Sequence, residues 1–308
     1  MSQPKIGALV GSGPLAIHES ALPRLQMDLP KEAAELSATM TALAAEGVSI
    51  ERGQRYAIHR GVAFVPVRGV LTPNSAILER YLGWATYHGI AETMAAVTAS
   101  DEVQATVMIY DTAGGAVMGI QAAVEAVKAA AMVKPVHGVV HPLAASAGYW
   151  VASQCTDISL TPGSWVGSVG TMMTADQPVQ PGLGGFQYYI LTSEHAGAKR
   201  PDLSTDEGKA LAQTRLDTME ADFLSAVAEG RNIAAADVPG RMSRTDNDRD
   251  GGDVFWGADA IERGLADVAE TVPEFMARIG GLYAPKPRPN KSRAYLARAE
   301  AAKAAASL

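Results

Sequence analysis

The feature that most constrains the fold is an alternation of strand-like and helix-like segments between residues 62 and 173. Val62–Leu71 and Val103–Tyr110 are dense in β-branched and other apolar residues, which is typical of parallel strands covered on both faces. Between them, Gly89–Ala99 has the apolar spacing of an amphipathic helix. Strands that alternate with helices predict an α/β domain with a parallel sheet and right-handed crossovers.

The same alternation continues toward the C-terminus. The further elements that we predict are, in chain order, a helix over Val117–Val127, a strand over Val136–Val140, a turn at His141–Pro142, a helix through Gly148–Val151, strands over Ile158–Leu160, Trp165–Met173 and Tyr188–Thr192, a long helix that opens at Ser204, and a short helix over Ala258–Gly264. The spacing Ser204–Glu207 is that of a capping box. The long helix has an apolar face made by Leu211, Leu216, Met219, Phe223 and Val227.

Composition divides the chain into three parts. Residues 1–61 form a mostly helical lead-in, with a helix from Pro30 toward Leu43, and residues 62–284 form the α/β domain. Residues 285–308 are rich first in Pro, Lys and Arg and then in Ala, which predicts a flexible, solvated tail with a marginal helix.

The charge argues against nucleic acid as a partner. The chain carries 26 Lys and Arg against 33 Asp and Glu, a formal net charge of −7. The tail has six basic residues and one acidic residue, so it is +5 and the rest of the chain is −12. Phosphate contacts need a basic surface, and we therefore expect no nucleic-acid binding.

Cysteine usage and hydropathy exclude further classes of protein. Cys155 is the only cysteine, which excludes a disulfide framework and a multi-cysteine metal site, and its apolar surroundings indicate a buried thiol. No cluster of His, Asp and Glu has the spacing of metal ligands, so we predict no metal and no cofactor. The uncharged stretch Pro135–Thr156 contains prolines, histidines and glycines, and we interpret it as a buried strand, turn and helix and expect no membrane anchor.

Two glycines follow the strand that ends at Tyr110. In Asp111–Ala116, Gly114 and Gly115 stand between a strand end and the expected start of a helix. Adjacent glycines let backbone N–H groups approach a ligand closely at the positive end of a helix, which suits a phosphate or an oxyanion. The alternative is a tight turn that needs glycine for its positive φ.

A serine among small residues follows the next strand. Ser146, within Pro142–Tyr149, is flanked by Ala and Gly, so that its hydroxyl can stand at a helix N-terminus where a substrate carbonyl could approach. The alternative is that Ser146 only caps the helix. Farther along, Lys199 lies in His195–Pro201; a lysine in a dry site serves as a general base to a serine, although a surface lysine is the commoner case.

Taken in order, these segments resemble the signal peptide peptidase A family of serine–lysine peptidases. The order is Gly-Gly after one strand, Ser-Ala-Gly after the next, then Gly167–Gly170 and a lysine downstream. The resemblance covers Val62–Val268 and includes the closing stretch Ala260–Asp267. It implies the crotonase/ClpP-like α/β superfold.

The resemblance also implies a role for each candidate residue. Ser146 matches the family's nucleophile and Lys199 its general base, while Ser168 would hydrogen-bond and orient the lysine amine. The N–H groups of Gly115 and Ala147 would form the oxyanion hole. In the family the dyad can be assembled across a protomer interface, so we expect a homo-oligomer.

A second catalytic arrangement is disfavoured. His137 and His141 flank the strand before Ser146, and a Ser-His-Asp triad with Asp111 could be drawn from them. Strand-end histidines are more often hydrogen-bonded structural residues, and a Ser–Lys dyad does not require them.

The lead-in points to one branch of the family. Gly13–Ile17 and the helix after it resemble the N-terminal part of phage capsid-assembly (prohead, protein C-type) proteases. We therefore predict a serine endopeptidase that cleaves scaffold, portal or capsid proteins, or itself, during phage or prophage head maturation. Its expected location is the host cytoplasm, within the procapsid.

Three alternatives stay open. The first is a soluble bacterial signal-peptide peptidase in the bacterial cytoplasm. The second is a crotonase-type acyl-CoA enzyme, which would use the glycine pair as its oxyanion turn. The third is a catalytically inactive structural subunit of a capsid vertex, and the presence of both Ser146 and Lys199 argues against it.

Overall fold

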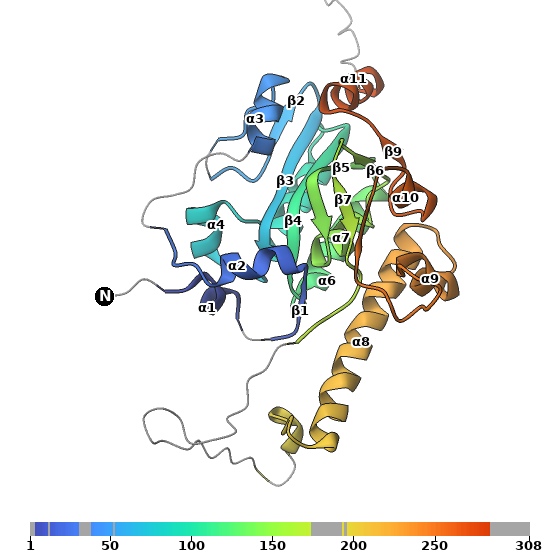
Figure 1. The fold of residues 1–308 in the computed structure, drawn as a ribbon. Coiled ribbons are helices and arrows are strands. Elements are labelled where there is room, and N and C mark those ends of the chain that lie inside the picture. The colour runs from blue at the N-terminus through green and yellow to red at the C-terminus, as the bar shows by residue number, and fades with distance from the viewer. Residues whose placement is uncertain are drawn as a thin grey trace, which may run out of the picture.

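The computed structural model describes residues 4–11, 13–30, 38–51, 53–173, 193 and 196–283 (Figure 1). Several predicted features lie outside these residues. They are the strand Tyr188–Thr192, residues 31–37 of the helix expected from Pro30, His195, and the tail 285–308.

A mixed, mostly parallel sheet forms the centre of the molecule. Its main strands follow in the order β2–β3–β4–β5–β6–β9, and β2 alone among these pairs antiparallel with its neighbour. The predicted α/β class with a parallel sheet is thereby confirmed. The bounds are Ala57–His59 (β2), Val62–Leu71 (β3), Ala105–Ala116 (β4), Val136–Ala145 (β5), Asp157–Leu160 (β6) and Val268–Ala269 (β9).

Three short strands join this sheet away from its main path. β1 (Leu15–Ile17) pairs antiparallel with the end of β4. β7 (Trp165–Gly167) pairs parallel with the end of β5, and β8 (Val254–Trp256) pairs antiparallel with β7. The lead-in therefore contributes two strands, β1 and β2, to the sheet of the following domain.

Helices cover both faces of the sheet. Successive residues of each strand point to opposite faces, so each strand contributes side chains to both apolar layers. On β3, Phe64 belongs to the apolar cluster that contains α3 and α11, whereas Val65 belongs to the cluster that contains α5, α6 and α7. On β4, Ile109 and Tyr110 divide in the same way. The helices are α1 (Ile6–Val10), α2 (Leu22–Leu25), α3 (Ala38–Ala45), α4 (Ala76–Leu82), α5 (Tyr87–Ala99), α6 (Ile120–Ala131), α7 (Ala147–Ala152), α8 (Asp206–Gly230), α9 (Val238–Met242), α10 (Gly257–Glu262) and α11 (Val272–Leu282), with single 3₁₀ turns η1 (Glu19–Ala21), η2 (Gly197–Lys199) and η3 (Ala235–Asp237).

The helix predicted over Gly89–Ala99 is α5, which starts two residues earlier. Thr86 caps it, and its hydroxyl accepts a hydrogen bond from the Gly89 N–H at 3.0 Å. At the same end of the helix the buried Tyr87 hydroxyl donates a hydrogen bond of 2.5 Å to the carbonyl of Ala116. This bond ties α5 to the last residue of β4.

The predicted turn at His141–Pro142 is wrong. β5 continues through these residues, and its pairing with β4 resumes after a register shift, with Asp111 opposite Leu143. The strand predicted over Trp165–Met173 is shorter than expected and ends at Gly167. Long-range pairing, which a local pattern does not report, decides both boundaries.

The long helix α8 is attached to the sheet through its C-terminal half. Trp150 of α7 stacks on Phe223 with ring centroids 4.4 Å apart, and the Gln154 side chain donates a hydrogen bond of 2.9 Å to the Ala226 carbonyl. The N-terminal half extends away from the sheet (Figure 1). Leu211, predicted on the buried face, is 45% exposed there.

The cap of α8 lies one residue later than predicted. The Thr205 hydroxyl accepts the Gly208 N–H at 3.0 Å, and the helix begins at Asp206. Ser204 does not cap it, because its hydroxyl donates to the Asp202 carboxylate at 2.7 Å. The predicted helix is therefore present, with its start displaced.

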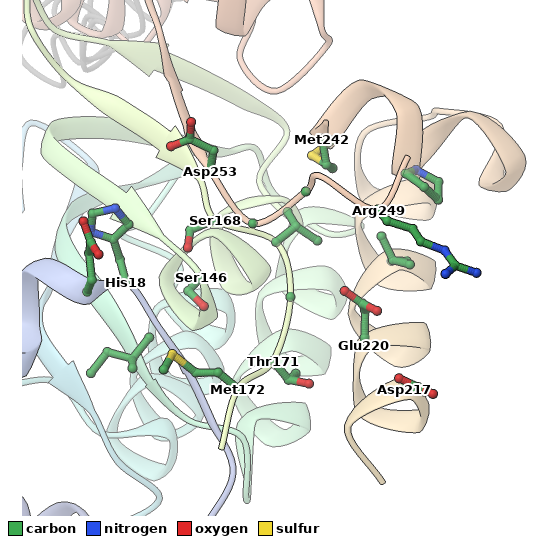
Figure 2. A pocket seen from close by; sticks show the side chains of 18 of the residues that line it. His18, Ser146, Ser168, Thr171, Met172, Asp217, Glu220, Met242, Arg249 and Asp253 are labelled. Carbon is green, nitrogen blue, oxygen red and sulfur yellow. The ribbon is translucent and has the colours of Figure 1, made fainter. Parts of the chain in front are cut away.

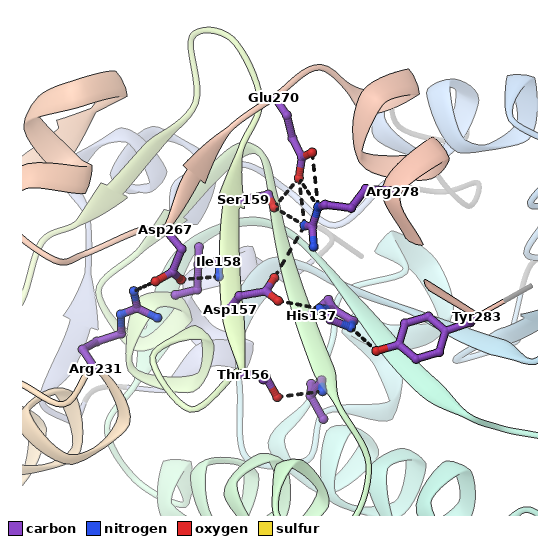
Figure 3. A network of polar contacts seen from close by, with 11 residues as sticks. His137, Thr156, Asp157, Ile158, Ser159, Arg231, Asp267, Glu270, Arg278 and Tyr283 are labelled. Atoms are coloured by element: carbon purple, nitrogen blue, oxygen red, sulfur yellow. Dashed lines mark hydrogen bonds and ion pairs between the residues drawn. The ribbon is translucent and has the colours of Figure 1, made fainter. Parts of the chain in front are cut away.

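A polar network ties the start of β6 to the C-terminal helix (Figure 3). His137 Nδ1 and the Asp157 carboxylate are 2.7 Å apart, and His137 Nε2 lies 2.7 Å from the Tyr283 hydroxyl. The Arg278 guanidinium bonds Glu270 at 2.8 Å and lies 3.6 Å from Asp157. Burial raises the pKa of Asp157, but His137 and Arg278 together lower it below its ordinary value.

Asp157→Asn is expected to destabilise the fold by about 1–2 kcal/mol at pH 7, because it removes a charged hydrogen-bond acceptor from this network. A carboxyl with a lowered folded pKa contributes stability above its unfolded pKa of about 4 and loses it as the pH falls through the folded value. Urea unfolding should therefore show a constant difference from the parent protein down to about pH 5 and a shrinking one below about pH 4. Asp101→Asn, at an exposed position, is the control; a difference for Asp157→Asn that persists unchanged to about pH 3 would contradict the assignment.

Candidate active site

Ser146 stands at the junction of β5 and α7. Its backbone has φ 54° and ψ −123°, a strained conformation for a residue with a side chain. Its N–H donates to the Gly167 carbonyl at 2.8 Å, which fixes the junction against β7. The side chain makes no capping hydrogen bond. The alternative that Ser146 serves only as a helix cap therefore has no support in the structure.

Ser146 lines a groove of about 1130 Å³ (Figure 2). The groove runs between the body of the sheet and the middle of α8. Its lining comes from five parts of the chain: Ile17–Glu19 and Leu22 of the lead-in, Ser146, the segment 168–172, the α8 residues Gln213, Asp217, Glu220 and Leu224, and the C-terminal residues Pro239, Met242, Asp248, Arg249 and 251–253. Ser146 itself is only 1% exposed and lies at the inner end of the groove.

Gly114 brings the backbone of β4 directly against Ser146. With φ 102°, Gly114 has a conformation that favours glycine. A methyl group built on it would lie 2.2 Å from the carbonyl oxygen of Ala16 and 2.9 Å from both the Ala147 nitrogen and the Ser146 Cβ. All three atoms thus border one point beside the serine.

Position 115 requires glycine for a different reason, which is the close approach of β3. A methyl group there would lie 1.9 Å from the Leu71 carbonyl oxygen, so β3 and β4 could not approach as they do. The prediction that the Gly-Gly pair forms a turn at a helix start is wrong. Both residues lie in β4, because β1 and β3 pair with it on either side, and α6 begins only at Ile120.

The backbone N–H groups of Ala147 and Gly115 lie in two elements that meet beside Ser146, α7 and β4. Ala147 is the first residue of α7, a position whose N–H has no acceptor within the helix. The Gly115 N–H belongs to the antiparallel ladder between β1 and β4, in which Gly115 stands opposite Ala16. These are the two residues that the family resemblance implies as oxyanion donors.

Ser168 lines the same groove and shares its unusual backbone with Ser146. It has φ 54°, is 8% exposed, and its N–H donates to the Asp253 carbonyl at 2.6 Å. Figure 2 shows the two serines on the same side of the groove. Ser168 therefore stands where it could orient a group that approaches Ser146.

Lys199 does not line this groove within one protomer. It is exposed, on η2, and the Arg215 guanidinium donates to the carbonyl of Ala198 and so holds η2 against the N-terminal half of α8. That half projects away from the sheet (Figure 1). The structure brings Ser146, Ser168, Gly115 and Ala147 together and leaves Lys199 apart from them.

The sequence profile of peptidase family S49 matches residues 128–282, just over half of the chain. This chain belongs to peptidase family S49. The matched region contains Ser146, Ser168 and Lys199 and begins after the glycine pair of β4. The family expected from the sequence motifs is confirmed.

Two curated phage proteins are similar to this S49 chain. The head-tail preconnector protein GP5 of Enterobacteria phage P21 is 25% identical over 275 residues, covering 85% of this chain and 49% of GP5. The capsid assembly protease C of Escherichia phage lambda is 26% identical over 240 residues, covering 76% of this chain and 52% of the protease. The chain thus spans about half the length of the curated relatives it matches. A solved enoyl-CoA hydratase/isomerase family member superposes with a TM-score of 0.40 at 17% identity, over 74% of this chain and 73% of that one.

The histidines of the disfavoured triad lie outside the S49 groove. His137 is bonded to Asp157 and Tyr283, and His141 Nδ1 lies 2.9 Å from the Thr161 hydroxyl. Neither they nor Asp111 line the groove. Burial raises the pKa of Asp111, against the lowering effect of Arg68.

Cys155 is a buried thiol, 3% exposed and 3.4 Å from the Tyr110 hydroxyl. Burial raises the pKa of this thiol to about 12. Because the thiolate is the reactive form, we expect Cys155 to resist an aromatic disulfide reagent at pH 8 in the folded protein and to react at once in denaturant. Absorbance of the released thiolate measures this, and rapid labelling of the native protein would show the site to be open.

Sequence reasoning missed several groups of the groove. His18 lies at one side, and Asp217 and Glu220 of α8 lie at the other (Figure 2). Burial raises the pKa of Glu220, and neighbouring Asp217 raises it further. The helical spacing of Gln213, Asp217 and Glu220 was a signal for a shared polar face, but nothing in the sequence showed which element it would meet.

Two further classes of site find no support in the described part of the chain. Among those residues, no helix is both long and apolar enough to cross a bilayer. No group of three or more His, Cys, Asp or Glu side chains within the same ranges could hold a metal ion.

Proposed function

We propose that this chain is a serine endopeptidase with Ser146 as nucleophile and Lys199 as general base. The observation that carries the proposal is the position of Ser146 in a chain of family S49. It stands at a strained strand–helix junction, at the inner end of a groove, with the Gly114–Gly115 backbone and the Ala147 N–H beside it. Strained junctions of this kind present a nucleophilic serine in other hydrolase folds.

The proposed reaction is acyl transfer from a peptide to water. The uncharged Lys199 amine takes the proton from Ser146 while the serine oxygen attacks the peptide carbonyl. The N–H groups of Gly115 and Ala147 stabilise the negative oxygen of the tetrahedral intermediate. The lysine then gives its proton to the leaving amine, and a water molecule hydrolyses the acyl-enzyme by the same steps. Ser168 holds the lysine amine in position.

The lysine is proposed to come from a second copy of the chain. Within one protomer Lys199 is exposed and stands with the half of α8 that projects from the body. Leu211 on that half is 45% exposed and offers apolar surface for contact with a second copy. A homo-oligomer that buries this half of α8 would bring each Lys199 to the groove of a neighbour.

The names of the two phage relatives suggest the substrates. One is a capsid assembly protease and the other a head-tail preconnector protein. We infer that this chain cleaves head proteins, namely scaffold, portal, capsid or its own chain, in the host cytoplasm within the procapsid. In this proposal the peptidase domain comprises residues 62–284, residues 1–61 are a lead-in, and residues 285–308 follow the domain.

The groove disfavours one of the two principal alternatives, the acyl-CoA enzyme, and does not decide against the other. The groove is lined by five carboxylates (Glu19, Asp217, Glu220, Asp248 and Asp253) against Arg249 and His18, which disfavours the phosphates of an acyl-CoA. A bacterial signal-peptide peptidase would use the same chemistry, and it is distinguished by its genes: portal, scaffold and major capsid genes beside this one indicate the phage role.

The experiment that tests the function is co-expression with the adjacent structural genes, followed by intact mass of every product. The expected result is a set of shortened head proteins that is absent when Ser146→Ala replaces the parent chain. Protection of the protein from thermal unfolding by coenzyme A thioesters, with no head protein shortened, would instead favour the acyl-CoA enzyme.

A further inference from the structure

The strand β1 forms part of the wall of the groove that Ser146 lines, through Ile17. On one edge it pairs antiparallel with Gly114–Ala116 of β4. On the other edge the Leu15 N–H donates to the Met172 carbonyl at 2.9 Å, and the Met172 N–H donates to the Leu15 carbonyl at 2.8 Å. An extended segment of the lead-in is thus hydrogen-bonded on both edges by the two backbone segments that border the candidate nucleophile.

The register of this pairing directs one carbonyl group of β1 at the Gly115 N–H, one of the two proposed oxyanion donors. The His18 N–H donates to the Ala113 carbonyl at 2.6 Å, and the Val117 N–H donates to the Pro14 carbonyl at 3.1 Å. Hydrogen-bonded pairs alternate with non-hydrogen-bonded pairs in an antiparallel ladder. Ala16 and Gly115 lie midway between the two bonded pairs, so they too form a hydrogen-bonded pair. The Gly115 N–H therefore points at the carbonyl of Ala16.

The same carbonyl approaches the Gly114 backbone, which also lies against Ser146. The methyl position of Gly114, which is 2.2 Å from the Ala16 oxygen, is 2.9 Å from the Ala147 nitrogen and from the Ser146 Cβ. The Ala16 carbonyl oxygen, the Ser146 Cβ and the Ala147 nitrogen thus border the same point of the β4 backbone. A substrate carbonyl attacked by Ser146 must enter the same region.

The segment fills its position completely. Ala16 is 0% exposed and Ile17 4% exposed. Leu15 and Ile17 pack in the apolar cluster that includes Val70 and Trp84 of the body. Because both edges of β1 are paired and its central residue is fully buried, a second extended peptide cannot bind there at the same time.

We propose that β1 is an internal occupant of the peptide-binding groove, which keeps a protomer latent until the segment 14–17 leaves. The proposal rests on the proposed function and adds the substrate class. An extended segment of a substrate adds as a strand between Gly114–Ala116 and Met172, with a small residue at the position of Ala16. The exchange conserves backbone hydrogen bonds, so a three-residue strand is displaced at modest cost.

A reversible covalent lock tests this exchange. In the double variant Leu15→Cys/Met172→Cys, oxidation links β1 to the body across the bridge between the two residues; the buried Cys155 does not compete. We expect the oxidised form to cleave a co-purified head protein at least about tenfold more slowly than the reduced form of the same variant. Equal rates in the two forms would overturn the proposal.

The matched control places a disulfide elsewhere in the lead-in. Lys5 and Asp28 form the same kind of isolated antiparallel bridge, joined by an exposed ion pair of 2.9 Å, and they do not line the groove. In Lys5→Cys/Asp28→Cys, oxidation leaves β1 free to move, so the oxidised and reduced forms are expected to cleave at the same rate. A loss of rate on oxidation here as well would attribute the effect to the lead-in in general and overturn the role of β1.

A binding measurement separates this proposal from the catalytic one. In Leu15→Pro/Ser146→Ala, the proline removes the N–H that bonds Met172, which weakens β1 in its site. A fluorescent peptide with the sequence of residues 13–19 should bind the double variant at least about tenfold more tightly than it binds Ser146→Ala alone. In the single variant the tethered segment competes with the peptide at high effective concentration. The same peptide with tryptophan in place of the alanine should not bind.

Failure of the proposed peptidase function and failure of the β1 proposal give different results. Binding of the alanine peptide to the proline variant, with no cleavage of any head protein by the parent chain or by Leu15→Pro with Ser146 intact, would refute the proposed peptidase function and keep the groove as a strand-binding site. Absence of binding to the proline variant, in a protein whose thermal unfolding remains cooperative, would refute the occupancy of the groove by β1.

Discussion

Replacing Ser146 by alanine is expected to abolish cleavage of the co-expressed head proteins, with a loss of at least about 10³-fold in rate. The change removes the only atom that attacks the peptide carbonyl in the proposed reaction. The fold should be retained, because the Ser146 side chain makes no capping hydrogen bond and its backbone is held by the Ser146 N–H to Gly167 bond, which alanine preserves. We expect a change in unfolding free energy within about 0.5 kcal/mol.

The serine that follows α7 is the matched control. Ser153 is fully buried at the other end of the same helix, and its hydroxyl donates to the Trp150 carbonyl at 2.8 Å. Ser153→Ala should lower stability by about 1 kcal/mol and leave cleavage intact. If intact mass shows that Ser146→Ala still processes the head proteins, the assignment of the nucleophile is wrong.

The central fold could be predicted from the sequence because its signals are local and redundant. Val62–Leu71 is the strand β3 with the predicted bounds, and the helix expected over Gly89–Ala99 is α5. Both have dense apolar patterns and clear boundaries, which the two covered faces of the sheet require. Where an element depends on a distant partner, prediction failed. Gly114 and Gly115 look like a turn until β1 and β3 are known to pair beside them.

The residues of the candidate site also differ in whether a local sequence signal indicates them. Ser146 could be found because its signal is local: small Ala and Gly neighbours surround a serine where a strand passes into a helix. The acidic side chains of α8 and the strand β1 could not be found, since Glu220 and Ile17 reach the groove only through the packing of α8 on α7 and the pairing of β1 with β4. Lys199 is indicated by the family resemblance alone, and within one protomer it does not meet Ser146.

The position of Lys199 leads to a prediction about pairs of inactive variants. Lys199→Met should abolish cleavage as fully as Ser146→Ala does, because a thioether cannot take the serine proton. Arg200→Ala is the matched control: Arg200 is also exposed beside η2, but a guanidinium cannot act as a base near neutral pH, so its loss should change the rate little.

If the dyad forms between protomers, the two inactive variants complement each other when co-expressed. A groove that contains Ser146 from a Lys199→Met chain is completed by Lys199 from a Ser146→Ala chain. In a cyclic assembly with heterologous contacts and random mixing of equal amounts, about a quarter of the interfaces have this combination, and cleavage should return to about that fraction of the parent rate. Intact mass of the co-expressed head proteins measures it, with each variant alone as reference. A mixture as inactive as its components would show that serine and lysine come from one chain, which requires α8 and η2 to move toward the groove within a protomer.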